Sequence, residues 1–227
     1  MNRCALIIGC ILLTLAAPLS LAAADAEDTR NGLPLVYQST FDSGLEDWRF
    51  TDEKAWKIVE EDGNKVLALT AQSKYFPPVR SPINQALLKD LNLSDFVIEV
   101  RLKQTGREYG HRDLCLFFNH QDPAHFYYVH LATTADEHAN SIFLVNGEPR
   151  VSIAKERTDG TKWTSAYHQV KIERDTAAGA IKVYFDDMEK PVMVAEDKHF
   201  LSGAIGLGSF DDVGQFDDLK IWGTKVE

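Results

Sequence analysis

The sequence predicts an all-β protein, folded as an antiparallel sandwich or barrel, on three observations. Short segments of alternating polar and apolar residues recur between residues 35 and 222, which is the pattern of half-buried antiparallel strands. Turn-forming pairs such as Asn146-Gly147 and Asp159-Gly160 separate these segments. Helical patterns do not alternate with the segments, and no period of about 20–50 residues repeats, so a parallel sheet or a repeat architecture is disfavoured.

The alternation places the strands along the chain. In 96–103 apolar residues alternate with the charged Glu99, Arg101 and Lys103, and 180–186 repeats this pattern. A helix is predicted only at Asn84–Leu91, a short segment rich in leucine. The expected strands are Leu35–Phe41, Trp56–Glu60, Lys65–Ala71, Phe96–Lys103, Leu114–Asn119, Phe126–Ala132, Ile142–Val145, Val151–Ala154, His168–Arg174, Ala180–Asp186, Ala204–Phe210 and Phe216–Trp222.

Length and charge limit the class of protein. A chain of 227 residues with 44% hydrophobic and 26% charged residues is typical of one folded domain with a sizeable core. Lysine and arginine number 24 against 34 aspartate and glutamate, which gives a formal net charge of -10. A surface this acidic repels phosphate backbones and anionic lipid, so nucleic acid is excluded as a partner and a membrane surface is disfavoured.

The first residues have the features of a secretory signal peptide, which we assign to residues 1–26. Arg3 precedes an apolar run over 5–15 and an alanine-rich exit, with cleavage after Ala24 or Ala26. Residues 7–10 resemble a lipoprotein attachment box, but only nine residues precede Cys10, so plain secretion or export to the periplasm is favoured. No later run approaches the ~20 apolar residues that span a bilayer. We expect a polar leader over 27–34 and one domain over 35–223.

Only one cysteine remains after the predicted cleavage. An exported chain that retains only Cys115 forms no internal disulfide. The neighbours of Cys115 are apolar strand residues, so we expect its side chain to be a small buried group and not a nucleophile.

Three regions resemble the concanavalin A-like lectin and glucanase superfamily, especially its laminin-G-like and bacterial secreted members. They are the opening Phe41–Trp48, the pair of strands across 163–187, and the end of the chain over 203–223. The resemblance covers about 35–223 and implies an antiparallel jelly-roll β-sandwich, one of whose sheets is concave and binds glycans. Lectins, binding modules, glucanases and polysaccharide lyases share this fold, so the fold leaves the function open. The E-x-D-x-x-E motif of the glucanases is absent, which disfavours a retaining glucanase.

Polar and aromatic side chains gather between residues 99 and 140, where five of the seven histidines fall within 111–138. Alternation puts Phe126, Tyr128 and His130 on one face of their strand, which we assign to the open concave sheet. The same alternation points Arg101 away from the core on its own strand. Either face of the next strand is possible for Asn119, and one of the two places it beside Phe126, Tyr128 and His130. The candidate catalytic residues are His130, Tyr128, Arg101 and Asn119, and the candidate substrate-binding residues are Phe126, His111, Arg112, His120, His138 and Asn140.

Two functions compete for this set, beside a structural role for each side chain at a strand end. In a binding protein, Tyr128 and Phe126 stack on sugar rings while the polar groups bond hydroxyls. In a polysaccharide lyase, Arg101 and Asn119 neutralise a uronate carboxylate, and His130 or Tyr128 removes a proton. We favour a secreted carbohydrate-binding domain. A glycan-cleaving enzyme, either a lyase or a hydrolase of a modified sugar, is the first alternative, and a protein-binding laminin-G-like module is the second.

The resemblance also implies a structural calcium ion. Members of the superfamily hold calcium near the first strand and an aspartate of the last strand, and Asp42 and Asp217 match those positions in outline. The alternative is that both aspartates cap backbone N–H groups in turns. No organic cofactor is expected, and the expected partner is a carbohydrate.

Overall fold

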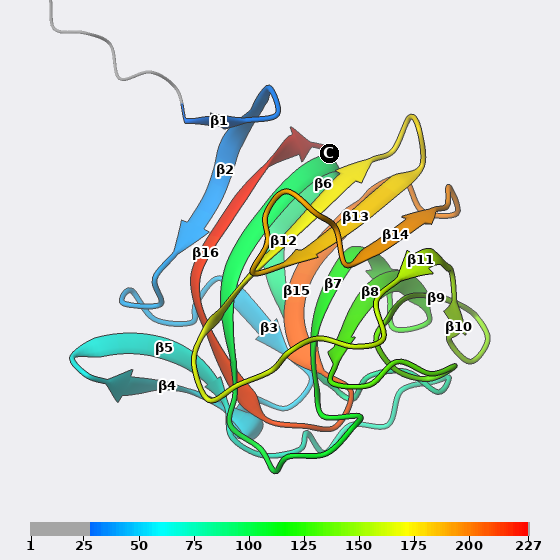
Figure 1. The fold of residues 1–227 in the computed structure, drawn as a ribbon. Helices are drawn as coiled ribbons and strands as arrows, with labels where there is room; N and C mark the ends of the chain where they lie inside the picture. The colour runs from blue at the N-terminus through cyan, green and yellow to red at the C-terminus, as the bar shows by residue number, and fades with distance from the viewer. Residues whose placement is uncertain (1–27, 227) are drawn as a thin grey trace, which may run out of the picture.

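The computed structural model describes residues 28–226, which fold as an antiparallel β-sandwich (Figure 1). The predicted signal peptide lies outside the described residues. One 3-10 helix, η1, covers Glu53–Ala55. The strands are β1 Thr29–Arg30, β2 Leu33–Ser39, β3 Trp48–Phe50, β4 Trp56–Glu61, β5 Asn64–Leu69, β6 Asn84–Gln104, β7 Asp113–Asp122, β8 His125–Ala132, β9 Ser141–Asn146, β10 Val151–Ser152, β11 Ala154–Arg157, β12 His168–Asp175, β13 Ala180–Phe185, β14 Met193–Glu196, β15 Gly203–Ser209 and β16 Gly214–Lys225.

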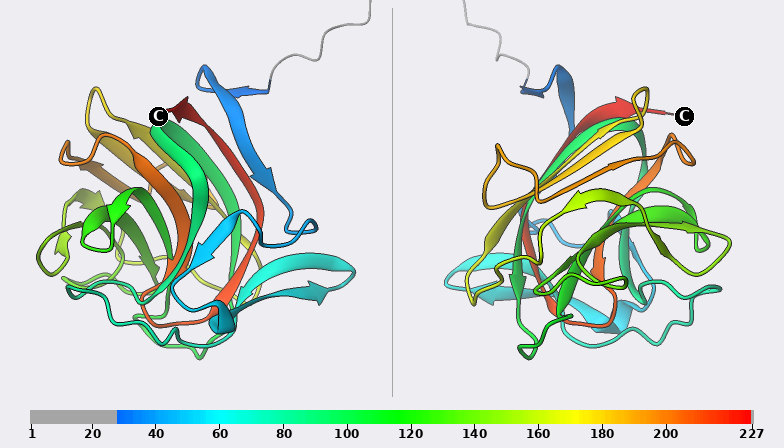
Figure 2. Two further views of the ribbon diagram at one scale, coloured as in Figure 1. Left: turned by 180° about the vertical axis from the view of Figure 1, so that it is seen from behind. Right: turned by 45° about the vertical axis from the view of Figure 1, so that its right-hand side comes forward.

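Strand β6 belongs to both layers of the sandwich. Its first half pairs with β3 and β15, and β15 continues through β7, β8 and β9 to β10; we call this layer the β7 sheet. The second half of β6 pairs with β12 and β16, and this layer, the β12 sheet, continues through β13, β14 and β11 and adds β2 beside β16. Figure 2 shows β6 curving from one layer into the other.

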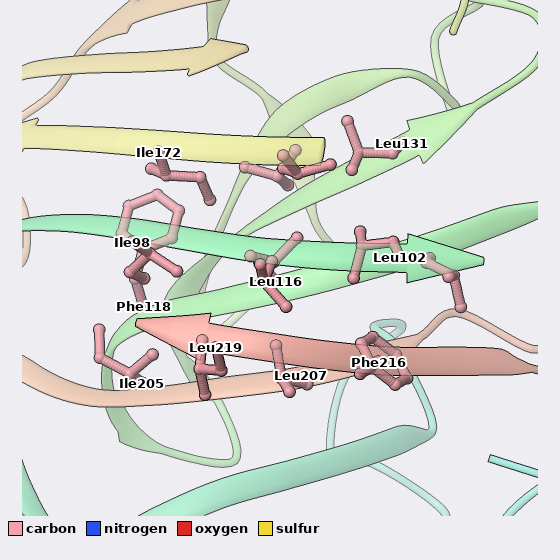
Figure 3. Packing of buried hydrophobic residues seen from close by; sticks show 14 of the residues in the cluster. Ile98, Leu102, Leu116, Phe118, Leu131, Ile172, Ile205, Leu207, Phe216 and Leu219 are labelled. Atoms are coloured by element: carbon pink, nitrogen blue, oxygen red, sulfur yellow. The ribbon is translucent and has the colours of Figure 1, made fainter. Parts of the chain in front are cut away.

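The main core fills the space between the two sheets (Figure 3). Ile98 and Leu102 of β6 and Ile172 of β12 point inward from the β12 sheet. Leu116 and Phe118 of β7 meet them from the β7 sheet, and all five side chains are fully buried. Burial of each such side chain stabilises the folded protein by about 1.5–3 kcal/mol. The apolar residues that the sequence alternation directs inward therefore hold the two layers together.

A second apolar cluster lies on the outer face of the β7 sheet. It contains Cys115 and Phe117 of β7, Phe126 and Tyr128 of β8, and Phe143 of β9, all fully buried. This arrangement confirms that Phe126 and Tyr128 lie opposite the main core and that Cys115 is buried, but the face is covered and not the open surface that was predicted. The connection from β5 to β6 covers the cluster.

We call residues 70–83, which form this connection, the strap. Val79 of the strap packs on the cluster. The strap is tied down near both ends: the Ser73 N–H donates to the Asn84 side chain at 2.7 Å, and the Ile83 N–H donates to the Phe210 carbonyl at 3.1 Å. A further bond joins the Arg150 N–H to the Arg80 carbonyl at 3.2 Å. The outer face of the β7 sheet is therefore largely an interior surface.

The structure confirms an all-β antiparallel sandwich and corrects several elements. The helix predicted at Asn84–Leu91 is wrong, because this segment is the first half of β6 and hydrogen-bonds on both edges to β3 and β15. The predicted leader is partly ordered, since β1 pairs with the start of β2. Strands β3 and β14 were not predicted, and the strand expected at Val151–Ala154 is divided between β10 and β11. Among residues 28–226 no helix has the length and apolarity to cross a membrane.

Candidate functional site

The structure does not bring the four predicted catalytic residues together. Tyr128 and His130 lie on the outer face of the β7 sheet, whereas Arg101 lies on the outer face of the β12 sheet, in the second half of β6. The Arg101 guanidinium is 2.9 Å from an Asp218 carboxylate oxygen and 4.7 Å from the centre of the Tyr167 ring. The main core therefore separates Arg101 from Tyr128 and His130.

Tyr128 and His130 are also sealed from solvent. The Tyr128 ring stacks on Phe143 with 5.1 Å between ring centres, and its buried hydroxyl has no hydrogen-bond partner among the described residues. His130 is 4% exposed, and its Nδ1 accepts a bond from the Asn140 N–H at 3.4 Å. Burial lowers the pKa of His130 to about 3 and raises that of Tyr128 well above its usual range. Neither side chain is therefore accessible to a polysaccharide.

The Asn119 side chain does not lie on the outer face of the β7 sheet, because the backbone conformation changes at this residue. Its φ of +44° lies in the left-handed region, which interrupts the alternation of β7. The side-chain amide donates to the Leu93 carbonyl at 3.2 Å and accepts from Arg174 at 3.2 Å. Asn119 is thus a buried structural residue of the sandwich interior.

Most of the predicted binding residues also have local partners. Arg112 is buried and donates to the Trp163 carbonyl at 3.0 Å, and Asn140 is buried with its amide donating to the Thr158 carbonyl at 3.0 Å. His111 is half-exposed and pairs with Asp136 at 2.6 Å, while His138 is exposed beside Glu137. These four residues lie near the start of β7 and the end of β8. None of them lines the pockets described for residues 28–226.

His120 alone of the predicted set lines an open pocket. The pocket, of about 500 Å³, lies on the outer face of the β7 sheet, where the strap leaves the sheet uncovered. The His120 ring stacks on Phe126 with 5.0 Å between ring centres, and this contact fixes the position of the imidazole. The pocket is lined by Arg49 and Phe50 of β3 and Thr51 after it, Tyr75 of the strap, Gln85 and Leu87 of β6, and His120, Gln121 and Asp122 at the end of β7 with Pro123 after it.

Both ring nitrogens of His120 are buried and lack a protein partner within residues 28–226. Burial and the nearby Arg49 lower the pKa of His120 to about 4, so at neutral pH the ring offers one donor and one acceptor nitrogen. An unpaired buried polar group costs about 1–3 kcal/mol, which a ligand or water that bonds it recovers. His120 is therefore the polar centre of the pocket.

Of the two charged residues at the pocket, Asp122 has hydrogen-bond partners within the protein and Arg49 has no ion-pair partner among the described residues. Asp122 is engaged: its carboxylate accepts from the Ala124 N–H at 2.7 Å and contacts His125 Nδ1 at 2.8 Å. Arg49 is exposed and has no carboxylate within ion-pair distance among the described residues. The free hydrogen-bonding capacity of the pocket thus comes from Arg49 and His120.

Two aromatic residues that line the pocket, Phe50 and Tyr75, were missed by the sequence analysis. Tyr75 lines the pocket, and Phe76 next to it is 94% exposed, the most exposed large apolar side chain of the described residues. The run Tyr75-Phe76-Pro77-Pro78 was the available signal, because two aromatic residues before two prolines predict an extended surface segment. This run lies outside the histidine-rich stretch.

Asp42 and Asp217 do not fit a shared calcium ion. Asp42 lies on an exposed turn and accepts from the Thr40 hydroxyl at 2.8 Å. Asp217 is buried in β16, where one carboxylate oxygen accepts from the Asn64 amide at 2.8 Å and faces Arg101 at 3.7 Å. A guanidinium at this oxygen competes with a cation, and in the described part of the chain neither aspartate belongs to a group of three possible ligands.

Comparison with known proteins places the fold. No family model matches the chain, and no curated protein matches its sequence. Among solved structures, the carbohydrate-binding module CBM66 from Bacillus subtilis matches with a TM-score of 0.56 and 19% identity over 79% of this chain and 97% of that one. Domain 4 of AbnA, an extracellular arabinanase of Geobacillus stearothermophilus in complex with arabinotriose, matches with a TM-score of 0.55 and 14% identity over 85% and 94%.

Peanut lectin, solved with a nine-residue peptide, matches with a TM-score of 0.56 and 14% identity over 84% of this chain and 97% of that one. At these identities the likeness establishes the fold. The chain has the concanavalin A-like jelly-roll fold that its sequence resembles.

Proposed function

We propose that the protein is an exported carbohydrate-binding domain and that its glycan site is the pocket around His120. One observation carries the proposal: a pocket on the sheet face contains a buried imidazole with two unpaired nitrogens and has aromatic side chains at its margin. A sugar needs apolar surface for the faces of its rings and a few directed polar groups for its hydroxyls. Tyr75 and Phe76 supply the first, and His120 and Arg49 supply the second.

The comparisons support this proposal through the fold. Two of the similar structures are described as a carbohydrate-binding module and as an arabinanase domain with arabinotriose bound. Export rests on the sequence of residues 1–26 and is tested by the mass of the protein recovered outside the cytoplasm. We propose binding without cleavage, because Tyr128 and His130 are buried and Arg101 lies on the opposite sheet.

Removing the aromatic surface should weaken glycan binding without unfolding the protein. We expect Phe76→Ala and Tyr75→Ala each to lower affinity at least about tenfold, because one aromatic contact is worth about 0.5–1.5 kcal/mol beyond its buried area. The measurement is a glycan-array screen with the natural chain, followed by calorimetric titration of the best ligand against each variant.

Leu201→Ala is the matched control, because Leu201 is also a large, exposed apolar residue, 51% accessible, and does not line the pocket. It should bind like the natural protein. Unchanged affinity in both aromatic variants, or an equal loss in Leu201→Ala, would move the glycan site away from the pocket. A ligand that yields shorter products on incubation would replace binding with cleavage.

A further inference from the structure

A group of acidic side chains lies at the end of the β7 sheet, away from the His120 pocket. It joins Asp113 at the start of β7 with Asp211 and Asp212 in the turn between β15 and β16. One possible ligand atom from each of the three lies within 4.8 Å of the others. Asp113 is fully buried, whereas Asp211 is exposed, so the group extends from the surface into the interior.

A fourth side-chain oxygen, from outside this acidic group, lies close to it. Gln104, the last residue of β6, is 5% exposed, and its side-chain oxygen is buried without a partner in the described residues. This oxygen and an Asp212 carboxylate oxygen converge beside Gly106, at 3.8 Å and 3.6 Å from the point where a Cβ would stand. The Gln104 amide nitrogen meanwhile donates to the Asp113 carbonyl, which fixes which way the oxygen points.

The hydrogen bonds of the group leave particular oxygens free. Asp113 Oδ2 accepts from the Phe210 N–H at 2.7 Å, while its Oδ1 is buried and unpartnered within residues 28–226. Asp212 Oδ2 accepts from the Tyr109 hydroxyl at 2.6 Å and from the Asp113 N–H at 3.0 Å. These bonds hold the two carboxylates rigidly and direct their remaining oxygens to a common space.

Arginines lie near the acidic group without contacting its carboxylates. Arg80, Arg107 and Arg150 lie near Asp211, yet none of them forms an ion pair with the three aspartates in the part of the chain that the structure describes. His130 Nε2 is 3.8 Å from Asp113, but burial keeps that imidazole neutral.

We propose that Gln104, Asp113, Asp211 and Asp212 form a calcium-binding site. Carboxylate and amide oxygens are the ligands that Ca²⁺ prefers, and a flexible shell of six to eight oxygens lets water complete the coordination. A cation here links the end of β6, the start of β7 and the turn between β15 and β16. It is a different place from the last-strand position that the sequence resemblance implies, where Arg101 stands against Asp217.

The test is the response of the full chain to calcium after treatment with EGTA. For the natural protein we expect about 1 mM CaCl₂ to raise Tm by roughly 5 °C or more, and MgCl₂ at the same concentration to raise it less. Calorimetric titration should give one calcium site per chain. Asp211→Asn removes one carboxylate at the exposed mouth, where folding does not depend on it, and should lower calcium affinity at least about tenfold.

Asp218→Asn is the matched control. Asp218, like Asp211, is an exposed aspartate next to a buried one, but it lies in β16 beside Asp217, the position that the resemblance implies. It should respond to calcium as the natural protein does. The proposal fails if calcium leaves Tm of the natural protein unchanged, if Asp211→Asn responds fully, or if Asp218→Asn is the variant that loses the response. No sugar enters this experiment, so its outcome is independent of the glycan proposal.

Discussion

Replacement of Arg174 by alanine is expected to lower the free energy of unfolding by about 3–5 kcal/mol. Arg174 of β12 is 3% exposed, and its guanidinium lies 5.4 Å from the centre of the Tyr127 ring. It donates to the Asn119 side chain at 3.2 Å and to the carbonyls of Gly179, Asp197 and Phe200 at 2.8, 3.0 and 3.0 Å. Alanine leaves all four acceptors without this donor inside the protein.

Urea denaturation measures the loss, and the chain supplies a matched control. Arg101→Ala removes an arginine that is half-exposed and whose close ion pair is with the exposed Asp218, so it should cost less than about 1 kcal/mol. Arg174→Lys keeps the charge but not the planar fork of donors, and should recover only part of the stability. Equal losses for Arg174→Ala and Arg101→Ala would show that the four buried bonds contribute little.

The second large effect is a dependence of stability on pH that comes from His120. Its pKa is lowered to about 4 in the folded protein, against about 6.5 in an unfolded chain. Between these values the unfolded state binds the proton more readily, so acid favours unfolding. The destabilisation that His120 causes is absent above about pH 6.5. It grows as the pH falls towards 4 and lowers the free energy of unfolding by roughly 3 kcal/mol in all.

His120→Phe isolates this contribution from those of other acidic and basic groups. Phenylalanine preserves an aromatic ring on Phe126 and removes the titration. Free energies of unfolding of the natural protein and the variant, measured between pH 8 and pH 4, should diverge in the variant's favour as the pH falls. Parallel curves over the whole range would mean that His120 is accessible enough to protonate freely in the folded state.

Local alternation predicted which face each side chain takes, but not which sheet carries it. The pattern at 96–103 correctly placed Arg101 outside the core, and that at 126–132 correctly set Tyr128 opposite the main core. The outward faces are on opposite sides of the molecule because β6 crosses between layers, and such a crossing depends on long-range pairing. The sequence also could not show that the strap covers Tyr128, since burial of that kind is a tertiary contact.

Other differences have equally local causes. The segment 84–91 has the composition of a helix, yet pairing on both edges makes it a strand, as tertiary contacts override weak propensities. Asn119 left its predicted face through a single left-handed residue. His120 was among the predicted binding residues, whereas Tyr75 comes to the same pocket through a connection that no periodicity describes.

The position of β16 has a consequence for the order of assembly. This strand is the last of the described strands to be synthesised, yet it lies between β2 and β6 and also pairs with β5. A nascent chain that ends before Gly214 therefore exposes three unpaired strand edges, and contacts this distant in sequence form slowly. The β12 sheet therefore completes only after β16 has emerged from the ribosome, and the partly folded chain is prone to aggregate until then.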